Sequence, residues 1–326
     1  MKITQINPIV SQYKSLDFGT IKLTQEKIEL YQILNKELIN LCKLLPESMQ
    51  SSAIQFLMDC SGISPGEPLD FFSKYYPPVW SVLYHIHMLK KRNPVPVNES
   101  ILIALQGQAY AMFLHSLDDH LNDGDIPASH LALLLRSTSW MRFNECIQYF
   151  TEKMPESKVI AKNLINDYYS GMMIDNMHAS LEQYCARFKK QVATGLIMPL
   201  CTTTLMGIDD PIVHHIQHSY ESFGVAWRLL DDIQDIEEDI KNRVQTAIYC
   251  SMPQKYSNLW NIEENNTRFE KIASLLMKEG IIYNIIQKIY NEMKKAEILA
   301  IKAGLAELAV EFSELNRPIS AVVKNT

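Results

Sequence analysis

The chain has 326 residues, of which 47% are hydrophobic and 21% charged, and its formal net charge is −6. This composition is typical of a folded globular protein and excludes a disordered chain, while the absence of a clustered basic excess argues against nucleic-acid binding. Six cysteines without CxxC spacing favour reduced, buried thiols over a zinc site. With no signal-type N-terminal segment and no apolar run of roughly 18 residues, we predict a cytoplasmic protein without a transmembrane helix.

Apolar residues recur at three- and four-residue spacing along the chain, which predicts helices throughout. Four predicted loops contain prolines and lie at residues 65–68, 93–96, 124–127 and 251–253. A long helical run from 158 to about 206 contains Gly195 and Pro199, so we expect a break or kink there. Asp210 and Pro211 fit the N-cap and first position of the next helix. Without repeats or low-complexity linkers, the pattern predicts one all-α domain over 1–326, with roughly ten or more helices.

Two acidic clusters each follow an apolar helical segment. The first contains Asp118, Asp119 and Asp123, and the second contains Asp231, Asp232, Asp235 and Asp239. Carboxylates four residues apart share a helix face and destabilise it by about 0.2–0.5 kcal/mol per pair. They also lie toward helix C-termini, where the helix dipole disfavours anions. Mg²⁺ ions would offset both costs and typically bind one or two carboxylates together with substrate phosphates.

Three other interpretations of the clusters fit the sequence less well. A solvated acidic surface would explain one cluster, but two clusters at the ends of apolar helices favour a shared site. A di-iron bundle requires Glu-x-x-His pairs, and none lies near either cluster. A His-Asp phosphohydrolase requires a His-Asp dipeptide, and the chain contains none. The sequence therefore predicts a magnesium site that binds a diphosphate.

The two clusters resemble the aspartate-rich motifs of class I isoprenoid synthases, which include trans-isoprenyl diphosphate synthases and class I terpene synthases. Residues 223–235, FGVAWRLLDDIQD, contain a complete DDxxD. Residues 115–123, HSLDDHLND, are similar to the first motif, with Asn122 at its last acidic position and Asp123 one residue later. The resemblance extends loosely from 74 to 241.

This resemblance implies a helical bundle around a central active-site cavity, a prenyl diphosphate substrate and a homodimer. It implies Mg²⁺ as cofactor, with three ions and Mn²⁺ as a substitute. Metal binding falls to all seven aspartates of the two clusters. Catalytic roles fall to Asp118, Asp119, Asp231 and Asp235.

Departures from the family pattern bear on the reaction type. The motif that holds isopentenyl diphosphate in elongating synthases falls at 73–78, where Lys74 is kept but Pro77 replaces the arginine. Residues 124–130 lack the usual paired arginines, and Arg228 replaces a glutamine. Since an anionic co-substrate without cationic partners is poorly held, we expect a terpene synthase, a lyase that ionises a single allylic diphosphate. The alternatives are a prenyltransferase using isopentenyl diphosphate or another acceptor, and an inactive helical scaffold.

Further residues are candidates for binding the diphosphate or stabilising a carbocation. The cationic candidates are Arg228, Arg187, Lys241, Arg243 and Lys74. The aromatic candidates are Phe113, Tyr110, Tyr84, Trp80, Trp227 and Phe223. Each aromatic face can stabilise a cation by about 0.5–2 kcal/mol. By the resemblance, a bulky Phe113 before the first motif implies a short substrate, and His115 and Tyr184 are candidates for accepting a proton.

Overall fold

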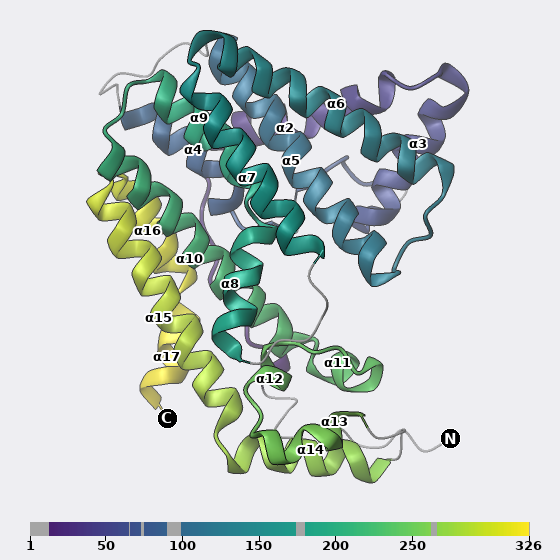
Figure 1. Ribbon diagram of the computed structural model, residues 1–326, viewed down its shortest axis with the longest axis vertical. Coiled ribbons are helices and arrows are strands. Elements are labelled where there is room, and N and C mark those ends of the chain that lie inside the picture. Colours follow the sequence, from purple (N-terminus) through teal and green to yellow (C-terminus); the bar gives the residue numbers. More distant parts are fainter. Residues whose placement is uncertain are drawn as a thin grey trace.

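Helices make up the regular structure of the computed structural model (Figure 1). The structure describes residues 13–64, 66–72, 75–89, 99–173, 180–261 and 266–325. Within these ranges there are sixteen α-helices, one 3-10 turn and no strand, which confirms the predicted all-α class. The helices are α2 (Gln25–Lys43), α3 (Glu47–Ser61), α4 (Pro78–Leu89), α5 (Glu99–Asp123), α6 (His130–Lys153), α7 (Glu156–Met173), α8 (Leu181–Gln191), α9 (Thr194–Leu205), α10 (Asp210–Gln234), α11 (Ile236–Asn242), α12 (Ala247–Cys250), α13 (Ser257–Asn261), α14 (Asn266–Lys278), α15 (Ile281–Lys302), α16 (Ala306–Leu315) and α17 (Arg317–Asn325), with the 3-10 turn at Gln254–Tyr256.

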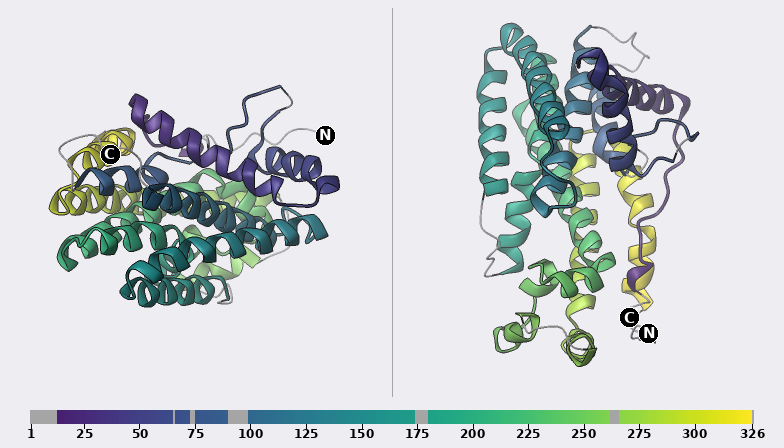
Figure 2. Two further views of the ribbon diagram at one scale, coloured as in Figure 1. Left: turned by 90° about the horizontal axis from the view of Figure 1, so that it is seen from above. Right: turned by 90° about the vertical axis from the view of Figure 1, so that its right-hand side faces the viewer.

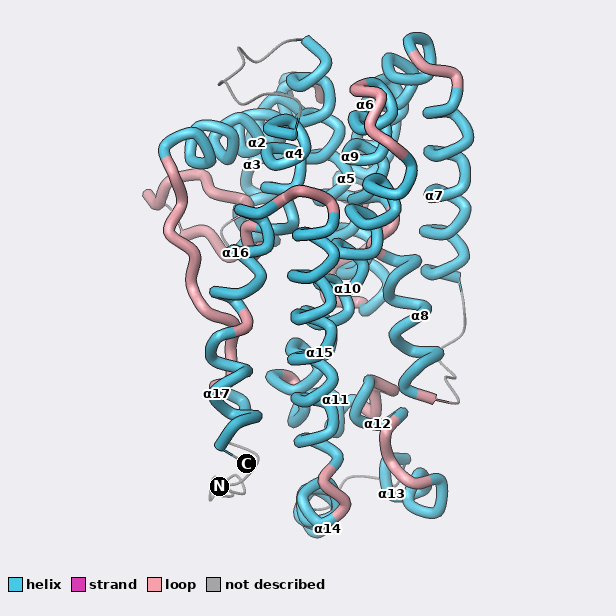
Figure 3. The backbone as a smooth tube through the Cα atoms, turned by 90° about the vertical axis from the view of Figure 1, so that its left-hand side faces the viewer, coloured by secondary structure: helices cyan, strands magenta, loops and turns pink. Residues whose placement is uncertain are grey.

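Most of the long helices run close to the long axis of the molecule, as the right-hand view of Figure 2 shows. Helices α13 and α14 lie across one end of this bundle (Figures 1 and 3). Helix α5 lies among four other helices of the bundle and packs against α2, α4, α6 and α9. Every residue from 107 to 114 of α5 is buried, as expected for a helix that is apolar nearly all round.

Helix α10 packs along α15 more extensively than any other pair of described helices, and also contacts α8, α9 and α12. Its buried face includes Ile216, Phe223 and Leu230. The Ser219 hydroxyl donates to the Ala296 carbonyl of α15 at 2.8 Å. This packing fixes the position of the second acidic cluster, which begins in the last turn of α10.

The predicted helix boundaries differ from the observed ones in detail. The long run from 158 is interrupted at 192–193, just before Thr194, while Pro199 lies inside α9. A second boundary separates α7 from α8. Asp209, rather than Asp210, is the N-cap of α10, so that Pro211 occupies the second helical position. Proline is tolerated there because the first-turn N–H groups have no intrahelical acceptor.

A buried ionic cluster joins α2, α4 and α16. Lys27 Nζ lies 2.8 Å and His85 Nε2 3.2 Å from Glu311 Oε1, and the Ser81 hydroxyl donates to Glu311 Oε2 at 2.7 Å. Burial by itself would raise the pKa of Glu311. The hydrogen bonds and charges of His85 and Lys27 outweigh it and hold that pKa below its ordinary value. The carboxylate is therefore stabilised in its ionised form.

The cysteines and the length of the apolar helices were both subjects of prediction. All six cysteines are free, and burial raises the pKa of Cys42, Cys146, Cys185, Cys201 and Cys250. Among the described residues, no helix combines the length and apolarity that crossing a membrane would require.

Candidate active site

A cavity of about 360 Å³ lies where the C-terminal parts of α5 and α10 face each other. Its walls come from α3, the loop residues 71, 75 and 76, α5, α8 and α10. The lining residues are Cys60, Ser61, Phe71, Tyr75, Tyr76, His115, Ser116, Asp119, His120, Phe188, Trp227, Arg228, Asp231 and Gln234. Each predicted acidic cluster thus contributes one aspartate, Asp119 or Asp231, to the same cavity.

The adjacent residues Asp118 and Asp119 have different environments. Asp118 is buried and accepts hydrogen bonds from Arg136 Nε at 2.5 Å, Arg136 Nη2 at 3.0 Å and the Tyr168 hydroxyl at 2.6 Å. Both of its carboxylate oxygens are therefore engaged by α6 and α7. Asp119 lines the cavity instead. Asp123, four residues later, is the last residue of α5, and its side chain lies outside the described structure.

Asp232 in the second cluster is likewise bound by the protein itself. Its side chain is 1% exposed. It accepts a hydrogen bond from the Tyr184 hydroxyl at 3.0 Å and one from the Ala247 backbone N–H at 2.9 Å. Arg228 Nε lies 3.1 Å away. Asp232 therefore anchors the start of α12 to α10, and the cavity-facing aspartate of this pair is Asp231.

Asp231, Asp235 and Asp239 lie on one stripe across the junction of α10 and α11. The hydrogen bonds from Asp235 N to Asp231 O, at 2.9 Å, and from Asp239 N to Asp235 O, at 3.0 Å, keep helical spacing through the junction. Burial and then neighbouring carboxylates raise the pKa of Asp231 to about 6 and that of Asp239 to about 8, opposed by Arg228. Burial and Glu238 raise the pKa of Asp235.

These carboxylates suit a hard divalent cation. Asp239 Oδ2 is buried and has no hydrogen-bond partner within the described residues. Clustered carboxylates with raised pKa values are stabilised by a bound cation. No three acidic, imidazole or thiol groups of the described segments converge on one point. An ion here would complete its coordination with water or substrate oxygens, which is the usual situation for Mg²⁺.

Arg228 is the predicted cation that lines the cavity. Its Nε donates to the Tyr184 hydroxyl at 2.8 Å, and its Nη1 lies 3.5 Å from Asp231 Oδ2. The guanidinium also lies 5.9 Å from the centroid of the Phe188 ring. Arg228 Nε also lies 3.1 Å from Asp232 Oδ1. Arg228 is therefore held by buried partners while its side chain borders the cavity beside Asp231.

Three of the other predicted cations, all described, do not line the cavity. Arg187 Nε donates to the Gly171 carbonyl at 2.8 Å, and this side chain is not among those that line the cavity. Lys241 and Arg243 are exposed at the end of α11, where Arg243 adopts a left-handed backbone conformation with φ of 60°. Lys74 lies outside the described residues.

Aromatic side chains from a loop and two helices form much of the cavity wall. Trp227, which was predicted, has its ring centroid 5.7 Å from that of Tyr75 and 5.9 Å from that of Tyr76, both in edge-to-face geometry. Phe71 and Phe188 also line the wall. Sequence reasoning did not identify these four additional rings. Tyr75 and Tyr76 lie in a loop segment without periodicity, and the only signal was their position within the stretch that resembles a family motif.

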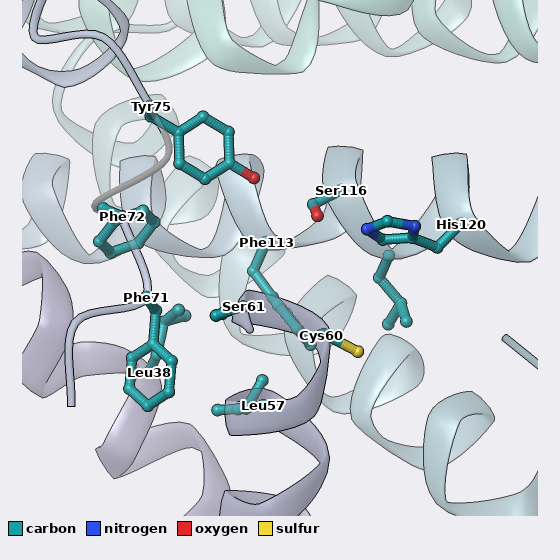
Figure 4. Close-up of a pocket in the computed structure, with 11 residues that line it drawn as sticks. Leu38, Leu57, Cys60, Ser61, Phe71, Phe72, Tyr75, Phe113, Ser116 and His120 are labelled. Carbon is teal, nitrogen blue, oxygen red and sulfur yellow. The ribbon is translucent and has the colours of Figure 1, made fainter. Parts of the chain in front are cut away.

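A narrow apolar crevice of about 20 Å³ adjoins this cavity. Figure 4 shows the Phe113 side chain reaching from α5 toward Cys60 and Leu57 of α3. Phe113 thus lines the crevice next to the cavity and not the cavity itself. The remaining predicted aromatic residues, Phe223, Tyr110, Trp80 and Tyr84, line neither space.

The two candidates for accepting a proton are also distinguished. His115 lines the cavity, and its buried Nδ1 has no hydrogen-bond partner in the described part of the chain. The Tyr184 hydroxyl instead donates to Asp232 and accepts from Arg228. Burial, followed by the Asp232 charge, raises the pKa of Tyr184 well above its ordinary value. Within the described residues, His115 thus has an unengaged ring nitrogen, whereas the Tyr184 hydroxyl is engaged by Asp232 and Arg228.

Comparison with known proteins identifies the fold. No family model and no curated protein sequence matches the chain. A polyprenyl synthase from Caulobacter crescentus CB15, solved with calcium and isoprenyl diphosphate, is 11% identical with a TM-score of 0.65, over 92% of this chain and 98% of that chain. A decaprenyl diphosphate synthase from Rhodobacter capsulatus is 13% identical with a TM-score of 0.62, over 93% and 100% of the two chains.

A third similar structure is a geranylgeranyl pyrophosphate synthase from Corynebacterium glutamicum, complexed with isoprenyl diphosphate and magnesium. It is 10% identical with a TM-score of 0.55, over 90% of this chain and 99% of that chain. At these identities the likeness establishes the fold alone. The chain has the isoprenoid synthase fold, and the structural resemblance predicted from the two aspartate-rich motifs is confirmed.

Proposed function

We propose that this protein binds an allylic prenyl diphosphate through Mg²⁺ ions and ionises it. The observation that carries this proposal is that Asp119 of α5 and Asp231 of α10 face one aromatic-lined cavity, with Arg228 beside them. The similar structures are named as prenyl synthases, and this likeness supports a reaction in which the prenyl group is transferred to an acceptor. We therefore place the prenyltransferase ahead of the lyase that the sequence favoured. The single domain over 1–326, the homodimer and the cytoplasmic location stay predictions.

Lyase activity is the second candidate, and one observation favours it. Arg228 is the only arginine or lysine among the described residues that line the cavity. A second diphosphate would require cationic partners of its own. An acceptor other than isopentenyl diphosphate, or no acceptor at all, suits this charge distribution.

In this proposal the acidic residues hold the metal ions and Arg228 holds the diphosphate. Asp119, Asp231, Asp235 and Asp239 would hold Mg²⁺, together with Asp123. When bound, these ions neutralise charge on the departing diphosphate, worth several kcal/mol at the transition state. Arg228 donates N–H groups to diphosphate oxygens.

The cavity wall would surround the hydrocarbon part of the substrate. The Trp227, Tyr75 and Phe188 rings exclude water and present π-faces to the developing carbocation. Phe113 limits the depth available to the hydrocarbon tail. His115, whose side chain lines the cavity, would accept a proton from the cation if elimination ends the reaction.

Product analysis by gas chromatography–mass spectrometry tests the proposal. Purified protein and Mg²⁺ are incubated with geranyl, farnesyl or geranylgeranyl diphosphate, each with and without isopentenyl diphosphate. We expect products that require Mg²⁺ and disappear on chelation by EDTA. Longer diphosphates would establish the prenyltransferase, whereas hydrocarbons or alcohols from one diphosphate would establish the lyase. The absence of turnover with every substrate would overturn both and support the inactive scaffold.

Arg228→Ala is expected to lower kcat/KM for the allylic diphosphate by about 10- to 100-fold, because a charge-assisted donor to the leaving group is lost. Arg228→Lys should recover only part of the loss, since an ammonium cannot reproduce the guanidinium fork. Steady-state measurement of diphosphate release gives both values. Arg187→Ala is the matched control, and an equal loss in that variant would contradict the assignment of Arg228.

A further inference from the structure

The first half of α10 carries a histidine pair that the proposed reaction does not use. His214 and His218 are one turn apart, and their Nε2 atoms are 2.8 Å apart. Their rings cross at 85° with centroids 3.9 Å apart. Two ring nitrogens that converge in this way repel each other through their lone pairs unless a proton or a cation lies between them.

The separation of these nitrogens also fits a shared metal ion. Imidazole nitrogens bind Zn²⁺ at about 2.0–2.1 Å, so two of them on one tetrahedral ion lie about 3.3 Å apart. Histidines at i and i+4 on a helix are a recurrent way of placing two such ligands on one face. The Nε2 atoms of His214 and His218, now 2.8 Å apart, would move apart by about half an ångström to share an ion.

Glu221 provides the outer support that metal-binding histidines usually have. Its Oε2 lies 2.9 Å from His218 Nδ1, which fixes the ring and leaves Nε2 facing His214. A carboxylate on the far ring nitrogen also raises the basicity of the ligating one. Glu221 is 13% exposed and the His218 side chain 37% exposed, while His214 is exposed. The pair is thus accessible to ions from solvent, and its supporting carboxylate is sheltered.

We propose that His214 and His218 form a binding site for one divalent transition-metal ion, with Glu221 as the residue that orients His218. Imidazole ligands select Zn²⁺, Cu²⁺ or Ni²⁺ over Mg²⁺. Because no third protein ligand converges here in the described segments, water completes the coordination. His218 precedes Asp231 by thirteen residues of one helix, or about 20 Å, so this site is separate from the acidic cavity.

Calorimetric titration of the full, tag-free chain with Zn²⁺ tests this site. The buffer contains excess Mg²⁺, which occupies the carboxylate cluster without competing for imidazole. We expect one Zn²⁺ per chain, and the loss of this binding in His214→Ala and in His218→Ala. Glu221→Ala should weaken binding by about tenfold, as loss of a supporting carboxylate does.

His130→Ala removes another exposed histidine and is the matched control. Circular dichroism melting checks that each variant is folded. Absence of Zn²⁺ binding in the wild-type protein would overturn the proposal. So would equal binding in all variants, or an equal loss in His130→Ala, because either result would assign the ion to other groups. None of these outcomes depends on turnover of a prenyl diphosphate.

Discussion

Asp119→Asn is expected to lower kcat/KM for the allylic diphosphate by about 100- to 1000-fold while leaving the melting temperature unchanged. The reason is that Asp119 and Asp231 line the same cavity, where both would bind the Mg²⁺ ions that hold the diphosphate. Among the described residues, its carboxylate forms no hydrogen bond or ion pair that joins two helices. Removing its charge therefore removes stabilisation of the transition state and little of the fold.

Asp118→Asn should behave differently, although the two residues are adjacent. Asp118 is 6% exposed and accepts both donors of Arg136 and the Tyr168 hydroxyl. Loss of its charge leaves Arg136 without its buried partner. We expect the free energy of unfolding to fall by about 2–4 kcal/mol, with a smaller effect on kcat/KM than in Asp119→Asn.

The two variants are compared by urea denaturation and by diphosphate release under the same conditions. Asp167→Asn, an exposed aspartate on α7, is the control and should change neither quantity. Full activity in Asp119→Asn would contradict the placement of the metal site. Full stability with lost activity in Asp118→Asn would show that Asp118 is the metal ligand of this cluster, as the motif alone would suggest.

The fold was predictable because packed helices require apolar residues at three- and four-residue spacing, and this spacing can be seen in the sequence. The apolar arc of α5 predicted a central helix, and the structure buries every residue from 107 to 114. The helix boundaries were less predictable. Neither Ala193, the N-cap of α9, nor Asp209, the N-cap of α10, makes a side-chain capping hydrogen bond, so no capping contact marks these two boundaries in the sequence.

The candidate site was predictable in outline but not in its details. The aspartate-rich motifs pointed to α5 and α10, and the structure brings Asp119 and Asp231 to one cavity. The sequence could not show that Asp118 is bound by Arg136 from α6, because that contact depends on the packing of different helices. Wall residues from a loop, such as Tyr75, have no periodicity by which to be recognised.

Glu311→Ala is expected to lower the free energy of unfolding by about 3–5 kcal/mol, the cost of breaking a buried ion pair from one side. Lys27 and Glu311 have 7% and 3% exposed side chains, and they join α2 to α16. Without Glu311, the remaining ion-pair partner of Lys27 among the described residues is Glu307, 3.9 Å away and 64% exposed, while the Tyr84 ring centroid lies 5.3 Å from Lys27 Nζ. Glu307→Ala is therefore the matched control on the same helix, and it should change stability by less than about 0.5 kcal/mol.

The same carboxylate gives the stability a pH dependence of definite sign. Since its pKa in the folded protein lies below the ordinary value of 4.5, ionised Glu311 stabilises the fold fully above pH 4.5. That contribution is lost as the pH falls through the lowered folded pKa. The difference in unfolding free energy between the wild-type protein and Glu311→Gln should therefore be largest near neutral pH and shrink below pH 4.5. Denaturation at a series of pH values measures this difference, and a constant gap down to pH 3 would mean that His85 and Lys27 do not stabilise the ionised carboxylate.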